Sequence, residues 1–207
     1  MYLTTAFLLV SGVAVIEEGV PGRLERLLGG HVTAARWHRW IGFALMGAAV
    51  LSIVLRPAAA RRFLADSVRF RRNDLRWFAR YPRFLLRPGR HTPAPHEGHF
   101  DPGQRVMNCV VMLSLAVLAV SGVILSFAHL VTPEAFAWSL RAHRLATWVL
   151  AAAVTGHVLV ASGALPGYRG VWRAMHGDGR VPARLAGLLW PRWAREEATR
   201  TAERREP

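Results

Sequence analysis

The stretch SLRAHRLATWVLAAAVTGHVLVAS, residues 139–162, is apolar enough to cross a membrane, yet it contains two histidines, His143 and His157. A helix needs about 20 apolar residues to cross a hydrocarbon core of about 30 Å. Ionisable side chains at membrane depth are costly and therefore indicate a function. The stretch predicts a transmembrane helix in which both imidazoles have a role.

Three further apolar runs lie at about 1–16, 40–55 and 106–128. The chain has 207 residues, 52% of them hydrophobic, a formal net charge of +14 and a mean hydropathy of +0.20. We predict an all-α membrane protein, a bundle of four transmembrane helices in a single domain of residues 1–207. The predicted spans are about 1–18, 38–55, 106–128 and 143–162, with a loop at 56–105 and a tail at 163–207.

Arginine sets the predicted topology. Residues 56–105 contain twelve arginines and residues 163–207 nine more, whereas the connection 129–142 contains only Arg141. The positive-inside rule places the loop 56–105 and both termini in the cytoplasm of a bacterium, with the chain in its inner membrane. Arginine blocks that flank spans are explained by topology and by anionic lipid, so we predict a lipid partner and no nucleic-acid partner.

The loop itself interleaves arginine with large apolar residues between positions 61 and 86. This mixture predicts a cytoplasmic interfacial helix that lies among the lipid headgroups, with its aromatic side toward the lipid and its guanidinium side toward water. An ordinary basic tether on anionic lipid is the alternative.

A short repeat relates the four spans in pairs. The sequence VSGV occurs at 10–13 and again at 120–123, and the pair His-Arg begins both the second and the fourth predicted span. The repeat predicts two related helical hairpins. It places His38 and His143 at equivalent depth near the outer side.

Two imidazoles at one depth on facing helices can be the two axial ligands of a haem. Gly12 and Gly122 would allow a flat porphyrin to approach the backbone closely. Zinc would require more ligands than His38 and His143, and no cysteine or carboxylate lies at that depth. A hydrogen bond between helices is the alternative role for a single histidine.

His157 follows His143 by fourteen residues, which returns it to the same face of a helix. The two Cα atoms would be about 21 Å apart along the axis. One helix could therefore present a ligand near each surface of the membrane. A hydrogen bond to another helix remains the alternative for His157.

The remaining histidines and the one cysteine have simpler expected roles. His31 and His129 are expected to form hydrogen bonds near the outer surface. The histidines at 91, 96 and 99 lie in the loop RPGRHTPAPHEGHFDPGQR and are expected to be exposed. Cys109 excludes an intrachain disulfide and a cysteine-based metal cluster, and is expected to be a small buried hydrophobe.

Taken in order, several segments resemble a known family. They are RWHRWIGFALM at 36–46, FDPGQRVMNCVVMLSLAVLAVSGVIL at 100–125, the two histidines separated by thirteen residues, and the tail GYRGVWRAMHGDGRVPARLAGLLWPRW at 167–193. The chain resembles the cytochrome b (gamma) subunit of membrane-bound formate dehydrogenase and its thiosulfate-reductase relatives, from its start to about residue 197.

The resemblance implies two b haems within four helices. It makes His38 and His143 the ligands of the outer haem iron and His157 one ligand of the inner haem iron. It also implies a quinone site near the inner haem, at Asp101, Gly103, Gln104, Arg105 and His157. Asp101 stands where the family usually has Asn, and an ionised carboxylate can only accept hydrogen bonds.

The family carries its fourth haem ligand in a His-Trp pair about fourteen residues before the Ser-Gly of the first helix. Counting back from Gly12 reaches a position before Met1. We expect either that the true start lies upstream, or that the inner haem has a substitute ligand or is absent. The candidate substitutes are Met1, Met107 and Asn108.

The resemblance further implies partners: an iron–sulfur (beta) subunit and a molybdenum or tungsten catalytic (alpha) subunit on the periplasmic side. Electrons would pass through the b haems to menaquinone or ubiquinone, so this chain would be an electron-transfer subunit with no activity of its own on a soluble substrate. Two alternatives are a membrane anchor with one or no haem, and a stand-alone quinone oxidoreductase of the b561 type. The long loop and tail weigh against the latter.

Overall fold

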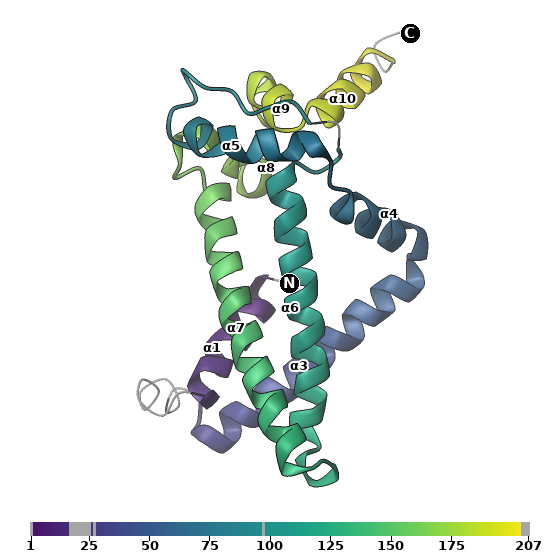
Figure 1. The fold of residues 1–207 in the computed structure, drawn as a ribbon, viewed down its shortest axis with the longest axis vertical. Coiled ribbons are helices and arrows are strands. Elements are labelled where there is room, and N and C mark those ends of the chain that lie inside the picture. Colours follow the sequence, from purple (N-terminus) through teal and green to yellow (C-terminus); the bar gives the residue numbers. More distant parts are fainter. Residues whose placement is uncertain (1, 17–25, 27, 97, 204–207) are drawn as a thin grey trace. The chain divides into compact units, whose positions relative to one another are not determined.

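The computed structural model describes residues 2–16, 26, 28–96 and 98–203 of the chain, and every regular element in these ranges is a helix. Three of the helices are long and apolar enough to span a membrane, and Figure 1 shows their course. They are α3 (His31–Leu55), α6 (Pro102–Ser126) and α7 (Pro133–Ala161). The predicted class, an all-α multi-pass membrane protein, is confirmed.

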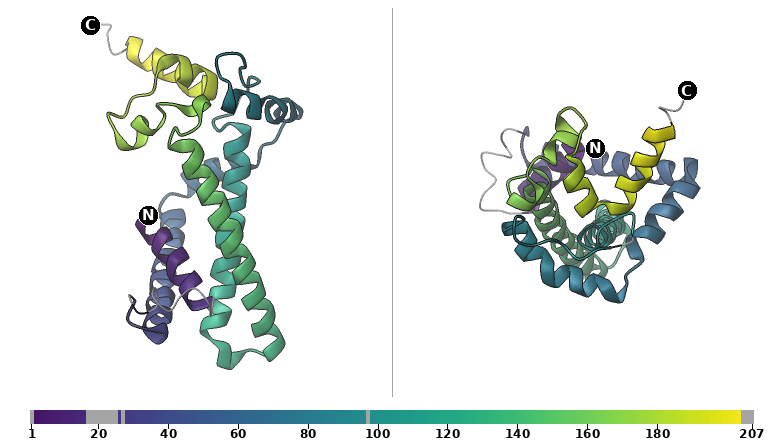
Figure 2. Two further views of the ribbon diagram at one scale, coloured as in Figure 1. Left: turned by 90° about the vertical axis from the view of Figure 1, so that its left-hand side faces the viewer. Right: turned by 90° about the horizontal axis from the view of Figure 1, so that it is seen from above.

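Helix α1 (Tyr2–Ile16) packs beside α3, as both Figure 1 and Figure 2 show. Its 15 residues give it a length of about 22 Å, less than a hydrocarbon core of about 30 Å. The fourth span therefore remains a prediction. Residues 17 and 18 of that predicted span, and the seven residues after them, lie outside the described residues.

The long helices begin earlier than the predicted spans. Helix α3 begins at residue 31 and α7 at residue 133, so His38 lies seven residues and His143 ten residues after the start of its helix. Hydropathy marks only the apolar part of a helix and misses its polar first turns. At α7 the start has its own signal, because Pro133 follows Thr132, whose hydroxyl accepts a hydrogen bond from the Ala135 N–H at 3.3 Å.

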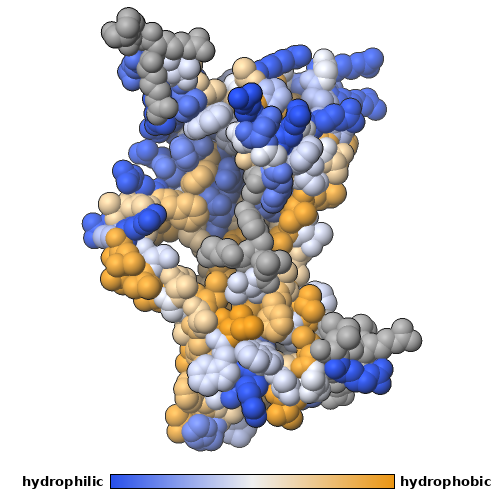
Figure 3. All heavy atoms as spheres, turned by 180° about the vertical axis from the view of Figure 1, so that it is seen from behind, coloured by the Kyte–Doolittle hydropathy of each residue, from blue (hydrophilic) through white to orange (hydrophobic). Residues whose placement is uncertain are grey.

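The surface of α3 is typical of a helix in contact with lipid. Large apolar side chains near its end, including Leu51, Ile53, Val54 and Leu55, are all more than half exposed. On the face drawn in Figure 3, apolar residues, in orange, form exposed patches beside hydrophilic residues, in blue. A soluble monomer rarely exposes a contiguous apolar surface of this kind, which is what a bilayer covers.

The chain divides into two compact units, residues 1–60 with 110–152, and residues 61–109 with 153–207. The first contains α1, α3 and the parts of α6 and α7 joined by the 3₁₀ turn η1 (Ala128–Leu130). The second contains the shorter helices: α4 (Pro57–Val68, which begins in the first unit), α5 (Arg72–Leu86), η2 (Pro166–Tyr168), α8 (Trp172–His176), α9 (Ala183–Leu189) and α10 (Pro191–Glu203).

The predicted interfacial helix over 61–86 is two helices, α4 and α5, with a break at residues 69–71. Asp74 causes α5 to begin where it does, because its carboxylate accepts a hydrogen bond from the Arg71 N–H at 2.8 Å. A carboxylate in the first turn of a helix also interacts favourably with the helix dipole. The prediction of a single helix over this segment is therefore wrong.

The aromatic residues of α5 mostly face the protein. Phe84 is buried in a cluster with Tyr168, Val171 and Leu189. Trp77 is also buried, 1% exposed, and its ring stacks on that of Tyr81 with centroids 4.2 Å apart. The expectation that the aromatic side of this segment faces lipid is therefore wrong for these residues.

His96 also departs from its prediction. It is 6% exposed, and its Nε2 lies 2.8 Å from the Leu189 carbonyl oxygen. The exposed loop predicted around it is partly buried because α9 covers it, and nothing close to His96 in the sequence indicates that contact. His99 is exposed, as predicted, and His91 is half-buried.

Candidate functional site

The first unit brings His38 of α3 and His143 of α7 together. Their ring centroids are 6.2 Å apart, and the ring planes are inclined at 74°. Both side chains are half-buried. The sequence repeat predicted that these two imidazoles lie at equivalent positions, and in the structure they face each other.

Each imidazole is held by a serine from the neighbouring helix. Ser11 Oγ lies 2.9 Å from His38 Nδ1, and Ser121 Oγ lies 2.9 Å from His143 Nδ1. Both serines are almost fully buried. They occupy the same position in the two VSGV repeats, so the structure contains the same serine–histidine pair twice.

The partners of the serines determine the tautomer of each imidazole. The Ser121 hydroxyl donates to the Val117 carbonyl at 2.6 Å, and the Ser11 hydroxyl donates to the Leu8 carbonyl at 3.3 Å. A hydroxyl has one proton, so each serine oxygen is left to accept a hydrogen bond from Nδ1–H. The Nε2 atoms of both rings then carry the lone pair that binds a metal.

Gly12 and Gly122 lie directly against these rings. A Cβ added at Gly12 would lie 3.2 Å from His38 Cε1, and one at Gly122 would lie 3.5 Å from His143 Cε1. The two glycines therefore make room for the imidazoles. We predicted that they make room for a porphyrin, and the structure shows the imidazole rings of His38 and His143 beside them.

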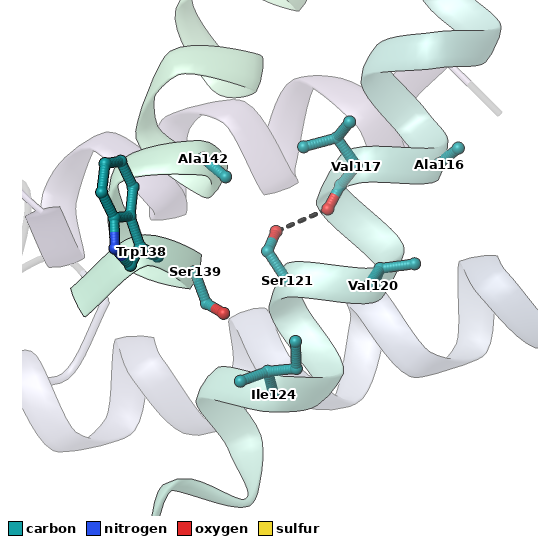
Figure 4. Close-up of a pocket in the computed structure, with 8 residues that line it drawn as sticks. All are labelled: Ala116, Val117, Val120, Ser121, Ile124, Trp138, Ser139 and Ala142. Carbon is teal, nitrogen blue, oxygen red and sulfur yellow. Dashed lines mark hydrogen bonds between the residues drawn. The ribbon is translucent and has the colours of Figure 1, made fainter. Parts of the chain in front are cut away.

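An apolar cavity of about 430 Å³ lies between α6 and α7 beside the His143 half of the site. Figure 4 shows Ser121 and Ser139 directed into it from the two helices. Its lining residues are Ala116, Val117, Val120, Ser121, Ile124, Trp138, Ser139 and Ala142. Cavities that hold cofactors are mostly apolar and have volumes of about 300–1,000 Å³.

The geometry fits haem. A metal–imidazole bond is about 2.0 Å long, so two imidazoles on opposite sides of one metal ion have ring centroids about 6 Å apart. The observed separation of 6.2 Å agrees. Within the described ranges, no three His, Cys, Asp or Glu residues are close enough to hold a metal ion. The site thus offers two ligands, and a porphyrin brings four of its own.

His157, the predicted ligand of the inner haem, lies on the same continuous helix as His143, and its side chain is exposed. Of the suggested substitute ligands, Met1 lies outside the described residues, and Met107 is half-buried on α6. Asn108 donates to the Ser67 hydroxyl at 3.0 Å. Cys109 was predicted to be a buried hydrophobe and not a ligand. It is half-buried, and its thiol is 3.5 Å from the Ser67 carbonyl oxygen. The inner haem remains a prediction.

The predicted quinone loop forms the start of α6. Asp101 caps this helix, because its Oδ1 accepts a hydrogen bond from the Gln104 N–H at 2.9 Å, and Pro102 is the first helical residue. Burial raises the pKa of Asp101 above the usual range of a carboxyl, although N–H groups from Gln104 and Gly103 oppose the shift. A Cβ on Gly103 would lie 2.9 Å from the Trp77 ring.

Arg105 is 2% exposed and is fully engaged inside the protein. Its Nη1 lies 2.8 Å from Asp74 Oδ2 and also donates to the Arg69 carbonyl at 2.8 Å. Its Nε donates to the Phe100 carbonyl at 3.0 Å. The loop is therefore a tightly packed corner, and direct contact of these residues with quinone remains a prediction.

Sequence reasoning missed four residues that build these sites. Ser11 and Ser121 lie within the VSGV repeat, but we predicted a role only for the glycines of that repeat. Asp74 had a weak signal, an acidic residue three positions into a helix. His96 had none, because its partner Leu189 is 93 residues away.

The family model described as prokaryotic cytochrome b561 matches residues 1–178. The matched range includes both serine–histidine pairs, and it also includes His157 and the loop before α6. No curated protein matches the chain.

Proposed function

The chain belongs to the prokaryotic cytochrome b561 family, and from this premise we propose that it is the haem b subunit of a formate dehydrogenase-type membrane complex. In that complex it would pass electrons from an iron–sulfur partner to membrane quinone. The general function, that of a haem b membrane electron-transfer cytochrome, follows from membership of the family. The observation that carries it is the facing pair of His38 and His143 with matching serine anchors.

His38 and His143 would hold the iron through their Nε2 atoms. A b haem bound there supplies a one-electron couple whose potential depends on its axial ligands and their hydrogen bonds. Ser11 and Ser121 fix the ring orientation, keep the proton on Nδ1 and raise the basicity of each imidazole as a ligand.

The role in a larger complex is supported by the sequence. The segments at 36–46, 100–125 and 167–193 occur in the order found in formate dehydrogenase gamma subunits. Helix α7 continues without a break from His143 to His157, so one helix would carry a ligand for each of two haems. Quinone would bind near His157 and the loop at 101–105, and the iron–sulfur and molybdenum or tungsten subunits would bind on the periplasmic side.

A second candidate is a stand-alone b561-type quinone oxidoreductase, and the description of the matched family favours it. The haem site itself does not separate the two candidates, because the pair of His38 and His143 lies within this one chain. An anchor with one haem would also retain this pair.

Purification of the tagged chain from native membranes in a mild detergent separates the candidates. The proposal expects an iron–sulfur protein and a molybdenum or tungsten protein to copurify, and expects formate or thiosulfate to reduce the haem in that complex. A haem-loaded chain that purifies alone, and that is reduced by quinol and not by either soluble donor, would favour the stand-alone enzyme. The variant His143→Ala serves as the control for reduction of the outer haem.

A further inference from the structure

Helix α5 has three distinct faces. The first is buried and contains Asp74, Trp77, Tyr81 and Phe84, the third of them half-buried. The second is apolar and exposed, with Leu75 74% and Leu86 61% exposed, and Phe78 between them. The third contains the arginines at 72, 76, 80, 83 and 87. Residues three or four positions apart share a face of a helix, so each set forms a continuous strip.

The buried face fixes where α5 lies relative to the membrane. Asp74 forms an ion pair with Arg105 in the first turn of α6 at 2.8 Å, and Trp77 packs against Gly103 in the same turn. Helix α6 has the highest hydropathy of the three candidate spans. Helix α5 therefore lies where α6 enters the apolar layer, at the level of the lipid headgroups.

A pocket lies beside the arginine face of α5, near the C-terminal end of the helix. Arg80 and Arg83 of α5, together with Arg90, His91 and Thr92, line a cavity of about 250 Å³. The chain folds back to form it, since the N–H groups of Arg90 and His91 both donate to the Arg87 carbonyl at 3.2 Å. The pocket is thus built from the last turns of α5 and the turn that follows.

Nothing on the described part of the chain neutralises this charge. Among residues 2–16, 26, 28–96 and 98–203, no carboxylate forms an ion pair with the arginines at 80, 83 or 90. Elsewhere the chain does pair its arginines, as with Arg105 and Asp74 or Arg192 and Glu196. Three arginines that line one pocket, with no paired carboxylate among the described residues, fit an anion that has several oxygen atoms.

We propose that this pocket binds the phosphodiester headgroup of an anionic phospholipid. Guanidinium groups bind phosphate through two parallel charge-assisted hydrogen bonds, and the side chains of Arg80 and Arg83 come from one helix face. The exposed apolar strip of Leu75, Phe78 and Leu86 on the same helix would contact acyl chains. A free phosphate would use the arginines alone, whereas a lipid uses both faces.

Native mass spectrometry tests the proposal on the intact, haem-loaded chain. The protein is delipidated in a neutral detergent and titrated with dioleoylphosphatidylglycerol or with dioleoylphosphatidylcholine. The test variant is Arg80→Gln/Arg83→Gln/Arg90→Gln. The matched control is Arg56→Gln/Arg61→Gln/Arg62→Gln, which removes the same charge from exposed positions outside α5 and the pocket. An unchanged b-type spectrum verifies that each variant is folded.

The wild-type chain and the control variant should bind one phosphatidylglycerol with similar affinity. The test variant should bind it at least about tenfold more weakly, since it loses the charge-assisted hydrogen bonds to the phosphate. Phosphatidylcholine should bind the wild type and the test variant equally weakly. An equal loss in the two variants would show that diffuse charge attracts the lipid, and would overturn the site. Saturable binding of inorganic phosphate without any preference for phosphatidylglycerol would overturn the lipid assignment.

Discussion

The hydroxyl oxygen of Ser121 lies 2.9 Å from Nδ1 of His143, and the ring centroid of this histidine is 6.2 Å from that of His38. Because the serine uses its own proton on the Val117 carbonyl, the imidazole must donate. A hydrogen bond of this kind makes a histidine a stronger ligand. It therefore favours the more highly charged, oxidised state of a bound iron.

Replacing Ser121 with Ala should raise the midpoint potential of the outer haem while the haem stays bound. Loss of one hydrogen bond of about 1 kcal/mol corresponds to a positive shift of about 40 mV for a one-electron couple. Redox titration of the b-type absorbance measures the shift, and Ser11→Ala should act in the same direction. Ser126→Ala is the control, since its hydroxyl donates to Gly122 O on the same helix and does not contact a histidine. Identical potentials in all four proteins would refute the anchoring role.

The histidines themselves should be indispensable for the outer haem. Either His38→Ala or His143→Ala should abolish one b-type signal in reduced-minus-oxidised spectra, because the remaining imidazole leaves the iron without its sixth ligand. His129→Ala, in the 3₁₀ turn η1, should leave the spectrum unchanged. Spectra of both ligand variants that match the wild type would rule out the assignment.

The two glycines should differ in their sensitivity to a side chain. Gly12→Ala places a methyl group 3.2 Å from His38 Cε1, whereas Gly122→Ala places one at 3.5 Å from His143 Cε1. We expect Gly12→Ala to lower haem occupancy more, as measured by the pyridine haemochrome assay per mole of protein. Gly47→Ala on α3 meets no atom within 4 Å and should leave haem occupancy unchanged. The reverse order of the two site variants would contradict the geometry.

The buried ion pair should stabilise the corner at the start of α6. Arg105→Gln leaves the Asp74 carboxylate buried without its partner, which typically costs about 3–5 kcal/mol. Thermal unfolding in detergent should show a clear loss of stability. Arg76→Gln, an exposed change on the neighbouring helix, should have a far smaller effect, and equal melting temperatures for the two variants would contradict the structural role of Arg105.

Asp101 should make stability depend on pH. Its folded pKa is raised by burial, so in the window between the ordinary carboxyl pKa and the raised one the folded state binds more protons than the unfolded state. Stability should therefore fall as pH rises through that window. Asp101→Asn should remove this slope and keep the helix cap, because Asn caps as well as Asp. Melting temperatures measured across mildly acidic to neutral pH compare the two proteins, and parallel curves would contradict the prediction.

Hydropathy was sufficient to predict α3, α6 and α7, because a bilayer requires long uninterrupted apolar helices. It could not place their first turns, which are polar and depend on local capping such as that of Thr132 on α7. The short repeat predicted the pairing of His38 and His143. It could not show that the serines hold the rings. A serine within a helix can also bond only to a backbone carbonyl of the preceding turn, and the sequence does not distinguish these two roles.

The loop at 56–105 was less predictable. Its composition predicted an interfacial segment, but the division between lipid-facing and protein-facing residues depends on partners distant in sequence. Trp77 packs on the first turn of α6, and His96 lies under α9. Such contacts bury residues that composition alone assigns to the surface.

The division of the site between two hairpins has a consequence for how the chain matures. Each hairpin contributes one imidazole with its own serine, and neither half can complete the coordination of iron by itself. Binding of the cofactor would therefore link two parts of the polypeptide that lie about a hundred residues apart in the sequence. A shortage of haem would then leave the two hairpins less firmly held, since a cofactor that binds only the folded state stabilises that state.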